Sequence, residues 1–481
     1  MMQPAFAIAG DVDPVALSII NWVEEQIDAK RADYALYRRY YGGDHKVLVT
    51  KRMRKFLPQN LTFRDNLCDV AIDSMAERMR VTGFEVEGAD DTDQRGKWLW
   101  DLWKTARMDR VQSVGHTETL MLGDGYVLVD WDNVGRRPRM FYQEPEMMIP
   151  HYDASTGELA WLSKKWRVEA EVGEESDTHR LNLYYPDRIE KYVSERTVWK
   201  QMRDETDTDW PQPWVDSAGQ PLGIPVIHFR NMSLSDDYGR SELSNAVPLQ
   251  DLINKSLIDY TQVADTMGWP QRYLVNITTG RSEMDMVPGA LWELMAETEG
   301  SYQVGQFATA DLGALLKGME MLVDHFSAVT RTPKHFLHLS GNYPSGEALK
   351  TAEAGLVSKI SERHTDFGNS WENVMKMALR LDAVFGQDAV GALGDDVVLN
   401  TIWKDPETRN EEAHYRALAI KKDNLGVSQE QIWRELGYDD TQIEAMQKDI
   451  EDEQVRASNL GSAVLERFAR GQDGGGQAGG P

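Results

Sequence analysis

Cysteine, long apolar runs and positive charge are all scarce in this chain. Its 481 residues include one cysteine, Cys68, so no internal disulfide framework can form. No apolar run approaches the roughly 20 residues that span a bilayer. The stretch from Met1 to Gly10 lacks the basic start of a secretory signal. These absences predict a soluble protein of a reducing cytoplasm, with Cys68 buried as a thiol.

Acidic residues dominate the charge. There are 78 Asp and Glu against 52 Lys and Arg, which gives a formal net charge of −26. Phosphate binding needs clustered Lys and Arg, so this balance argues against a surface that grips nucleic acid. It is compatible with DNA that slides, because an acidic wall repels phosphates and leaves no sticky site. The length and apolar content predict about two to four folded domains.

The most informative stretch runs from Asp311 to Phe385, where two helical patterns flank one short loop. The first begins at Asp311 and stops before Pro333, since proline disfavours a helical conformation in the residue before it. The second begins at Ser345, a favourable N-cap, and would be roughly 60 Å long if it is unbroken. The apolar stripe of the first helix comprises Leu312, Leu315, Met319, Leu322, Phe326 and Val329. The loop contains His338, Leu339, Ser340, Gly341, Asn342, Tyr343 and Pro344.

The remaining chain alternates helical and β-rich parts, which predicts an α+β fold. Helices are expected at Asp13–Tyr41, Arg64–Arg80 and Trp98–Met108, with a short strand at Val81–Val86. A mostly β region extends from Gly125 to about Arg230. Its strand candidates are Tyr126–Trp131, Arg139–Ile149, Leu159–Val168, Arg180–Tyr185, Ile189–Val193 and Val226–Arg230.

A second helical pattern, Leu249–Met267, precedes the helix at Asp311. The intervening Gln271–Ala310 consists of short strands and turns, so the two helices form a hairpin with a small β tip. Beyond Phe385, Val397–Trp403 is a strand candidate. Ser428 with Gln431 and Thr441 with Glu444 match capping boxes that open short helices. The glycine-rich end, Gly471–Pro481, is predicted to be disordered.

Catalytic and metal-binding motifs are weak. The glycines of Gly341–Gly346 have the spacing of a phosphate-binding P-loop, but Glu347 and Ala348 occupy the places of the required Lys and Ser/Thr. His335 and His338 form an HxxH pair outside a helix and without a catalytic Glu. The sequence therefore predicts no metal, no cofactor and no enzymatic activity.

One face of the helix at Asp311 carries mixed charge. Its residues are separated by three, four and seven positions, which aligns them on a helix: Lys317, Glu320, Asp324 and Arg331. On a lone helix such residues form an ordinary solvated surface. If copies of the helix circle an axis, they become stacked rings of charge.

At these residues the sequence resembles the portal proteins of tailed bacteriophages, in the branch typical of long non-contractile tails. The resemblance extends from about Tyr40 to Tyr438 and depends on the order and spacing of several short motifs. They are Tyr40–His45, Asp69–Phe84, Pro225–Asn231, Gly239–Leu243, Pro248–Lys255, Arg331–Pro333, and Ser345–Lys350 with Glu353.

The resemblance implies a ring, usually of twelve subunits, at one vertex of the phage head. Double-stranded DNA passes through its channel during packaging and ejection. The implied partners are other copies of the chain, the terminase large subunit, the major capsid protein and a head–tail adaptor. No membrane is involved, and assembly takes place in the host cytoplasm before the ring becomes part of the virion.

The parts of the family can be assigned along this chain. The wing is expected at 1–243 and is β-rich at 125–230, with stem helices at 244–268 and 311–330 around a clip at 269–310. A tunnel-loop region at 331–344 leads into the long wing and crown helix and strand at 345–404, and part of that helix belongs to the wing. A helical crown at 405–470 and the tail at 471–481 follow. The polar face of the second stem helix would line the channel, and His338 to Pro344 would form the tunnel loop.

Two other classes remain open from the sequence alone. A P-loop-like nucleotide hydrolase would use Gly341–Gly346, and its ATPase activity would be measurable on purified protein. A capsid or scaffold shell protein would form lattices rather than closed rings.

Overall fold

The computed structural model describes most of the chain before residue 451. The described residues are 6–46, 65–88, 94–168, 178–195, 198–204, 210–232, 237–268, 272–275, 277–278, 295–296, 303–306, 311–337, 346–386, 398–407, 418–422, 424, 426–436, 438, 442–443 and 445–450. Two compact units divide the chain, Met1–Pro406 and Glu407–Pro481.

The first helix, α1 (Pro14–Tyr41), begins and ends where the sequence predicts. The Asp13 side chain accepts hydrogen bonds from the backbone nitrogens of Val15 and Ala16, and proline fits the first helical position because its missing N–H has no partner there. Gly42 closes the C-terminal end. Along α1, Ala16, Ile20 and Val23 are buried against a β-sheet.

That sheet is antiparallel and seven-stranded, in the order β1-β9-β8-β7-β6-β5, with β10 paired to β8. Its inward side chains, including Leu181, Leu183 and Tyr192, form a small core with α1. The strands are β1 (Phe6–Asp11), β5 (Met148–Tyr152), β6 (Leu159–Arg167), β7 (Thr178–Tyr184), β8 (Arg188–Glu195), β9 (Val198–Asp204) and β10 (Gln212–Pro213).

A larger core surrounds α8 (Gly346–Phe385), which is a single unbroken helix as predicted. It contacts a three-stranded sheet and also the β2–β16 pair. Trp371 of α8 packs edge-on against Trp103 and Phe229, with ring centroids 4.9 and 4.8 Å away. The elements of this core include β2 (Val81–Val86), β3 (Asp124–Asp132), β4 (Arg137–Gln143), β11 (Val226–Arg230), β16 (Leu399–Trp403), α2 (Cys68–Ala76), α3 (Arg95–Thr105) and α4 (Met108–Leu122).

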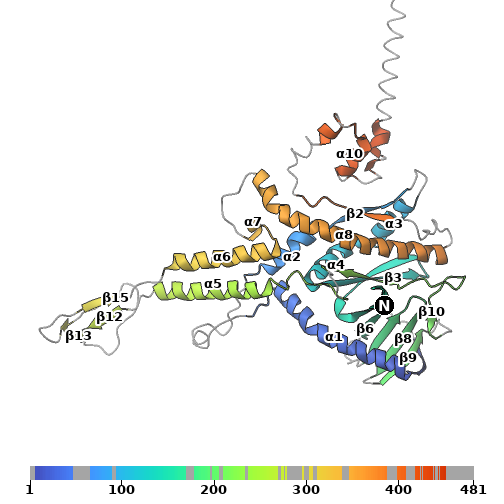
Figure 1. Cartoon of the computed structure of the whole chain (residues 1–481), viewed down its shortest axis with the longest axis horizontal. Helices are drawn as coiled ribbons and strands as arrows, with labels where there is room; N and C mark the ends of the chain where they lie inside the picture. The colour runs from blue at the N-terminus through green and yellow to red at the C-terminus, as the bar shows by residue number, and fades with distance from the viewer. Residues whose placement is uncertain are drawn as a thin grey trace, which may run out of the picture. The chain divides into compact units, whose positions relative to one another are not determined.

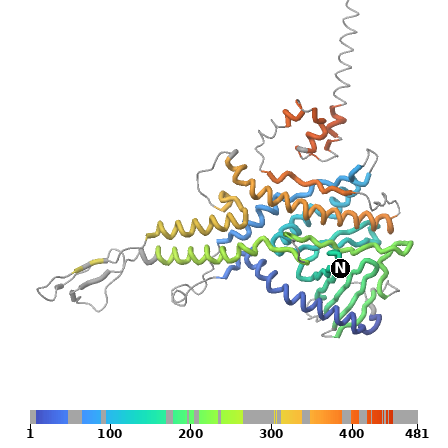
Figure 2. Tube along the Cα trace, viewed as in Figure 1, coloured from blue at the N-terminus to red at the C-terminus, as the bar shows by residue number. Residues whose placement is uncertain are grey.

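The predicted helical hairpin is present, with α5 (Val247–Gly268) and α6 (Leu312–Thr330) packed side by side (Figures 1 and 2). Between them, β12 (Arg272–Val275) pairs with β15 (Gln303–Gln306), and β13 (Ile277–Thr278) pairs with β14 (Met295–Ala296). The short α7 (Lys334–Leu337) follows α6.

Some predicted boundaries were wrong. The helix expected at Arg64–Arg80 is confined to Cys68–Ala76. The helix expected at Trp98–Met108 ends at Thr105, and Arg107, in the left-handed conformation, separates it from α4. Sequence reasoning missed α4 and the strands β1 and β9. The α4 stretch buries polar residues such as Gln112 and His116, so its apolar periodicity is weak.

Cys68 is a buried free thiol, as predicted, and burial raises its pKa. In the second unit, α10 (Gln429–Glu435) begins at Ser428, whose hydroxyl accepts from Gln431 N. Thr441, Glu444 and the tail Gly471–Pro481 lie outside the described residues. The wing, stem, clip and crown boundaries remain predictions.

Candidate functional site: the helical hairpin and its root

Three of the four residues predicted to form the charged face lie on α6. The helix begins at Asp311, whose carboxylate accepts from the backbone nitrogens of Gly313 and Ala314. Lys317 and Glu320 are exposed. Asp324 is partly buried and forms an ion pair with Lys334 of α7, with 2.7 Å between nitrogen and oxygen.

Arg331 does not continue this face as part of the helix. The helix ends at Thr330, and Arg331 is the cap residue in the left-handed conformation, with φ of 57°. Its side chain remains exposed. Burial lowers the pKa of Lys359 of α8, and the nearby Arg331 cation acts in the same direction. The four predicted residues therefore form a helical set of three and a separate cation at the elbow between α6 and α7.

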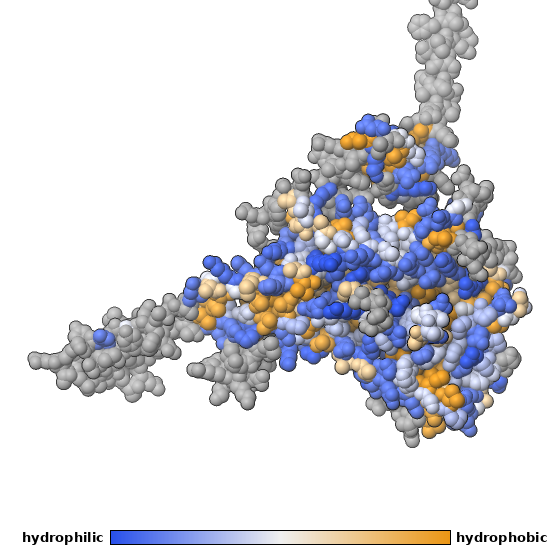
Figure 3. Space-filling model, in the orientation of Figure 1, coloured by the Kyte–Doolittle hydropathy of each residue, from blue (hydrophilic) through white to orange (hydrophobic). Residues whose placement is uncertain are grey.

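Much of the hairpin's apolar surface is uncovered within one chain. Val323 and Phe326 of α6 are buried, but Leu315 and Val329, which belong to the predicted apolar stripe, are 38% and 47% exposed. Within a single chain, the predicted apolar stripe is therefore only partly covered. Apolar side chains are visible along the hairpin in Figure 3. The large exposed ones are Leu252, Leu315, Leu316, Met321 and Val329.

The N-terminal part of α5 is held by buried polar side chains. Gln250 is fully buried; its Oε1 accepts from Leu67 N at 2.9 Å, and its Nε2 donates to Asp65 O and to Asn254 Oδ1. Asn254 Nδ2 donates to His45 Nδ1 at 2.8 Å. With Nδ1 accepting, the imidazole proton is on Nε2, which donates to the Tyr40 carbonyl at 3.0 Å. This chain of bonds attaches α5 to the segments around α1 and α2.

The C-terminal end of α6 is held by a buried charge cluster. Lys359 Nζ donates to the Thr330 carbonyl at 2.9 Å and lies 2.6 Å from Glu242 Oε2. Arg363 Nη2 contacts Glu242 Oε1 at 3.1 Å, and Asn231 Nδ2 donates to the same oxygen. Burial lowers the pKa of Lys359, while the Glu242 carboxylate acts in the opposite direction. One buried carboxylate thus pairs with two buried cations.

A second buried carboxylate holds α7. Glu353 of α8 is buried, and its oxygens contact Arg78 Nη1 at 3.0 Å and His335 Nε2 at 3.1 Å. The Arg78 guanidinium also lies over the Phe336 ring, 5.5 Å from its centroid. Both sides of the α6–α7 elbow are therefore bonded to α8.

These root residues form the part of the site that sequence reasoning did not assign. Glu353 appeared only as part of a motif, and Lys359 and Arg363 were not singled out. One signal was present, because Glu353, Lys359 and Arg363 recur at helical spacing within the same buried face as Leu356 and Ile360. Charged residues on a buried helical face indicate ionic partners elsewhere in the chain.

One known protein family matches most of this chain. The model of the family described as "Phage portal protein, SPP1 Gp6-like" matches residues 20–456. The chain belongs to this phage portal family. The match extends over the hairpin, its root and the long helix α8.

Two relatives that the chain matches over most of its length are portal proteins of mycobacteriophages. The chain is 27% identical over 415 residues to the portal protein of Mycobacterium phage D29, covering 81% of this chain and 79% of the relative. It is 26% identical over 412 residues to that of Mycobacterium phage L5, with the same coverage. A chain from the neck of a native gene transfer agent particle, computed with C12 symmetry, has 12% identity and a TM-score of 0.42 and aligns over 78% of this chain and 90% of its own.

The residues predicted to form the tunnel loop, His338 to Pro344, lie outside the described residues, as does most of the P-loop-like stretch. His335, the described member of the HxxH pair, contacts Glu353. Among the described residues, no group of three or more His, Cys, Asp or Glu side chains could hold a metal ion. In the same part of the chain, every helix is too short or too polar to cross a bilayer.

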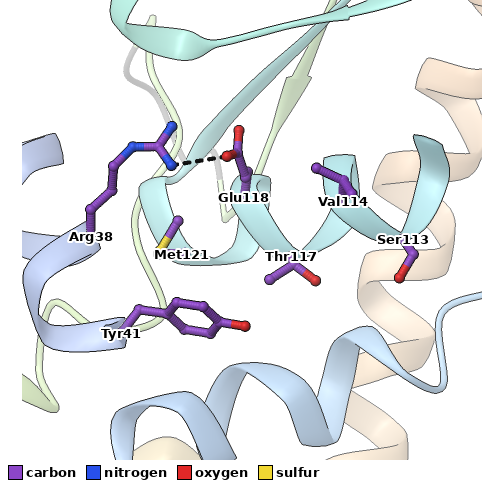
Figure 4. A pocket seen from close by; sticks show the side chains of 7 residues that line it. All are labelled: Arg38, Tyr41, Ser113, Val114, Thr117, Glu118 and Met121. Carbon is purple, nitrogen blue, oxygen red and sulfur yellow. Dashed lines mark hydrogen bonds and ion pairs between the residues drawn. The ribbon is translucent and has the colours of Figure 1, made fainter. Parts of the chain in front are cut away.

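A surface cavity of about 360 Å³ lies between α1 and α4 (Figure 4). Arg38 extends across it to Glu118 of α4, with 2.9 Å between nitrogen and oxygen, and also pairs with Glu146. Burial raises the pKa of the Tyr41 phenol, and its pairing with Asp73 acts in the same direction. The Arg38–Glu118 pair thus links α1 to α4 across the cavity.

The segment Gly123–Gly125, where α4 ends and β3 begins, has a structural role. Asp124 is fully buried and accepts hydrogen bonds from Tyr34 Oη at 2.8 Å, Gly239 N at 2.7 Å and His228 Nε2 at 3.0 Å. These bonds connect α1, β3 and β11.

Proposed function

We propose that the chain assembles with copies of itself, usually twelve, into a ring at the head vertex of the virion. The ring would be the channel through which double-stranded DNA enters and leaves. It would also be the docking platform for the terminase large subunit and the head–tail adaptor, and be held by the major capsid protein. The observation that carries this proposal is the portal-family match over residues 20–456.

The exposed apolar surface of the hairpin supports self-association. Leu315, Leu316 and Met321 are 38%, 37% and 55% exposed in one chain. Several exposed apolar side chains on one element of a folded protein are typical of an interaction surface. Neighbouring hairpins in a ring would cover these side chains and leave a polar face for the bore. The ring would be built in the host cytoplasm.

The charged face of α6 suits a conduit that performs no chemistry of its own. Rings of Glu320 and Asp324 would repel phosphates, while Lys317 and Arg331 would give transient contacts to the passing duplex. The net charge of −26 agrees with a wall to which DNA does not adhere. Translocation would be driven by the terminase, and the portal would need no cofactor.

The double variant Lys317→Glu with Arg331→Glu tests the channel role. We expect rings to form normally, because both side chains are exposed, but the fraction of stably filled heads to fall several-fold in a packaging and retention assay. The matched control is Lys97→Glu with Arg110→Glu, an equal charge change at exposed positions of α3 and α4. Normally filled, stable heads from the stem variant would show that these two residues do not act on DNA.

A further inference from the structure

We infer that the buried polar side chains at the root of the α5–α6 hairpin fix the angle at which it leaves the wing, and that they thereby set how many copies close the ring. The residues are Gln250 and Asn254 on one side and Lys359 with Glu242 on the other. This inference rests on the proposed ring.

The root of the hairpin is held by buried polar side chains rather than by apolar packing alone. Gln250 is 0% exposed, Asn254 3% and Lys359 7%, yet each is satisfied by a directional partner. Asn254 is bonded to His45, and Lys359 to the Thr330 carbonyl. Apolar contacts tolerate small rotations, whereas a buried donor that loses its acceptor carries a desolvation penalty. The bonds therefore favour one hairpin orientation over neighbouring ones.

The two helices of the hairpin are attached to different parts of the wing. Tyr40 of α1 donates to Asp251 of α5 at 2.6 Å, next to the Gln250 and Asn254 bonds. Lys359 binds α6 to α8 and, through Glu242, to the segment after β11. Because the attachments lie on both helices, a change of tilt would break bonds on at least one of them.

In a closed ring, the angle between neighbouring copies determines the number of subunits. A twelve-membered ring turns by about 30° at each interface, and a thirteen-membered ring by about 28°. If the wing and the hairpin both contact the neighbouring copy, both layers must turn by the same angle. A rigid root would make the wing and the hairpin adopt the same turn between neighbouring copies. A loosened root would let rings of different sizes close.

Lys359→Met and Asn254→Leu test this inference. Both substitutions keep side-chain length or bulk while removing the directional bonds, and Arg363 still neutralises Glu242 when Lys359 is replaced. Native mass spectrometry of purified rings gives the subunit number and its spread, and thermal unfolding shows whether the variants are folded. We expect the distribution to broaden or shift by at least one subunit relative to the unsubstituted protein.

A control variant and a milder root variant complete the experiment. Lys350→Met is the matched control, since Lys350 is an exposed lysine of the same helix, and its rings should match the unsubstituted ones. Tyr40→Phe removes one hydroxyl bond to Asp251 and keeps the ring stacked on His45, so it serves if the stronger variants do not fold. Unchanged ring counts in every folded root variant would overturn the inference. Failure of the unsubstituted protein to form rings would instead overturn the proposed function.

Discussion

Replacing Glu242 by alanine is expected to lower the free energy of unfolding by about 3–5 kcal/mol, because two buried cations lose their shared carboxylate. Lys359 and Arg363 have side chains that are 9% and 5% exposed, so water cannot replace the lost partner. Urea unfolding followed by tryptophan fluorescence measures the change.

A nearby glutamate provides the control for this prediction. Glu362 also approaches Arg363, at 3.8 Å, but its side chain is 59% exposed. Glu362→Ala should cost less than about 1 kcal/mol, as exposed pairs do. Equal effects of the two alanine variants would show that the buried cluster does not stabilise the hairpin root.

Acid should destabilise the unit Met1–Pro406 through His116. This side chain is buried between α8 and the end of α2; its Nδ1 donates to the Met79 carbonyl at 2.9 Å, and its Nε2 accepts from Trp371 Nε1 at 2.9 Å. Burial lowers the pKa of His116 to about 4, from an ordinary value of 6.5. The folded state therefore holds the neutral form, and the unfolded state binds a proton first as the pH falls.

Because the pKa of His116 is lower in the folded state than in the unfolded state, stability falls as the pH falls. The contribution of His116 is complete above pH 6.5 and is lost as the pH falls from 6.5 to about 4, for a total of roughly 3 kcal/mol. His116→Gln preserves a donor and an acceptor but does not titrate. Urea unfolding between pH 7 and pH 4 should show a shallower loss of stability in this variant. Identical pH profiles would mean that His116 does not carry the acid sensitivity.

The long elements of this fold could be predicted because their signals are local. The helices α1 and α6 begin at Asp13 and Asp311, whose carboxylates cap the first turn, and apolar residues recur at helical spacing along α5 and α8. The α8 helix spans 40 residues without a break, as its pattern predicts. Propensity, capping and periodicity agree in these helices, so sequence alone was sufficient.

The root could not be predicted in the same way because its partners are distant in sequence. Glu242 and Arg363 are 121 residues apart, and Gln250 reaches the backbone at Asp65 across 185 residues. Lys359 is buried but charged, so a search for apolar residues at helical spacing does not find it. It interrupts the apolar stripe of α8. Leu315 and Val329 are exposed for a different reason. In the proposed ring, the surface that covers them would belong to another copy of the chain.

Electron cryomicroscopy of the purified protein shows directly whether copies of this chain enclose a channel. We expect closed rings with a central channel, in which α6 helices surround the bore and Lys317 and Glu320 face it. A protein that stays monomeric under all conditions would overturn the proposed channel, as would a ring whose α6 charged face points away from the bore.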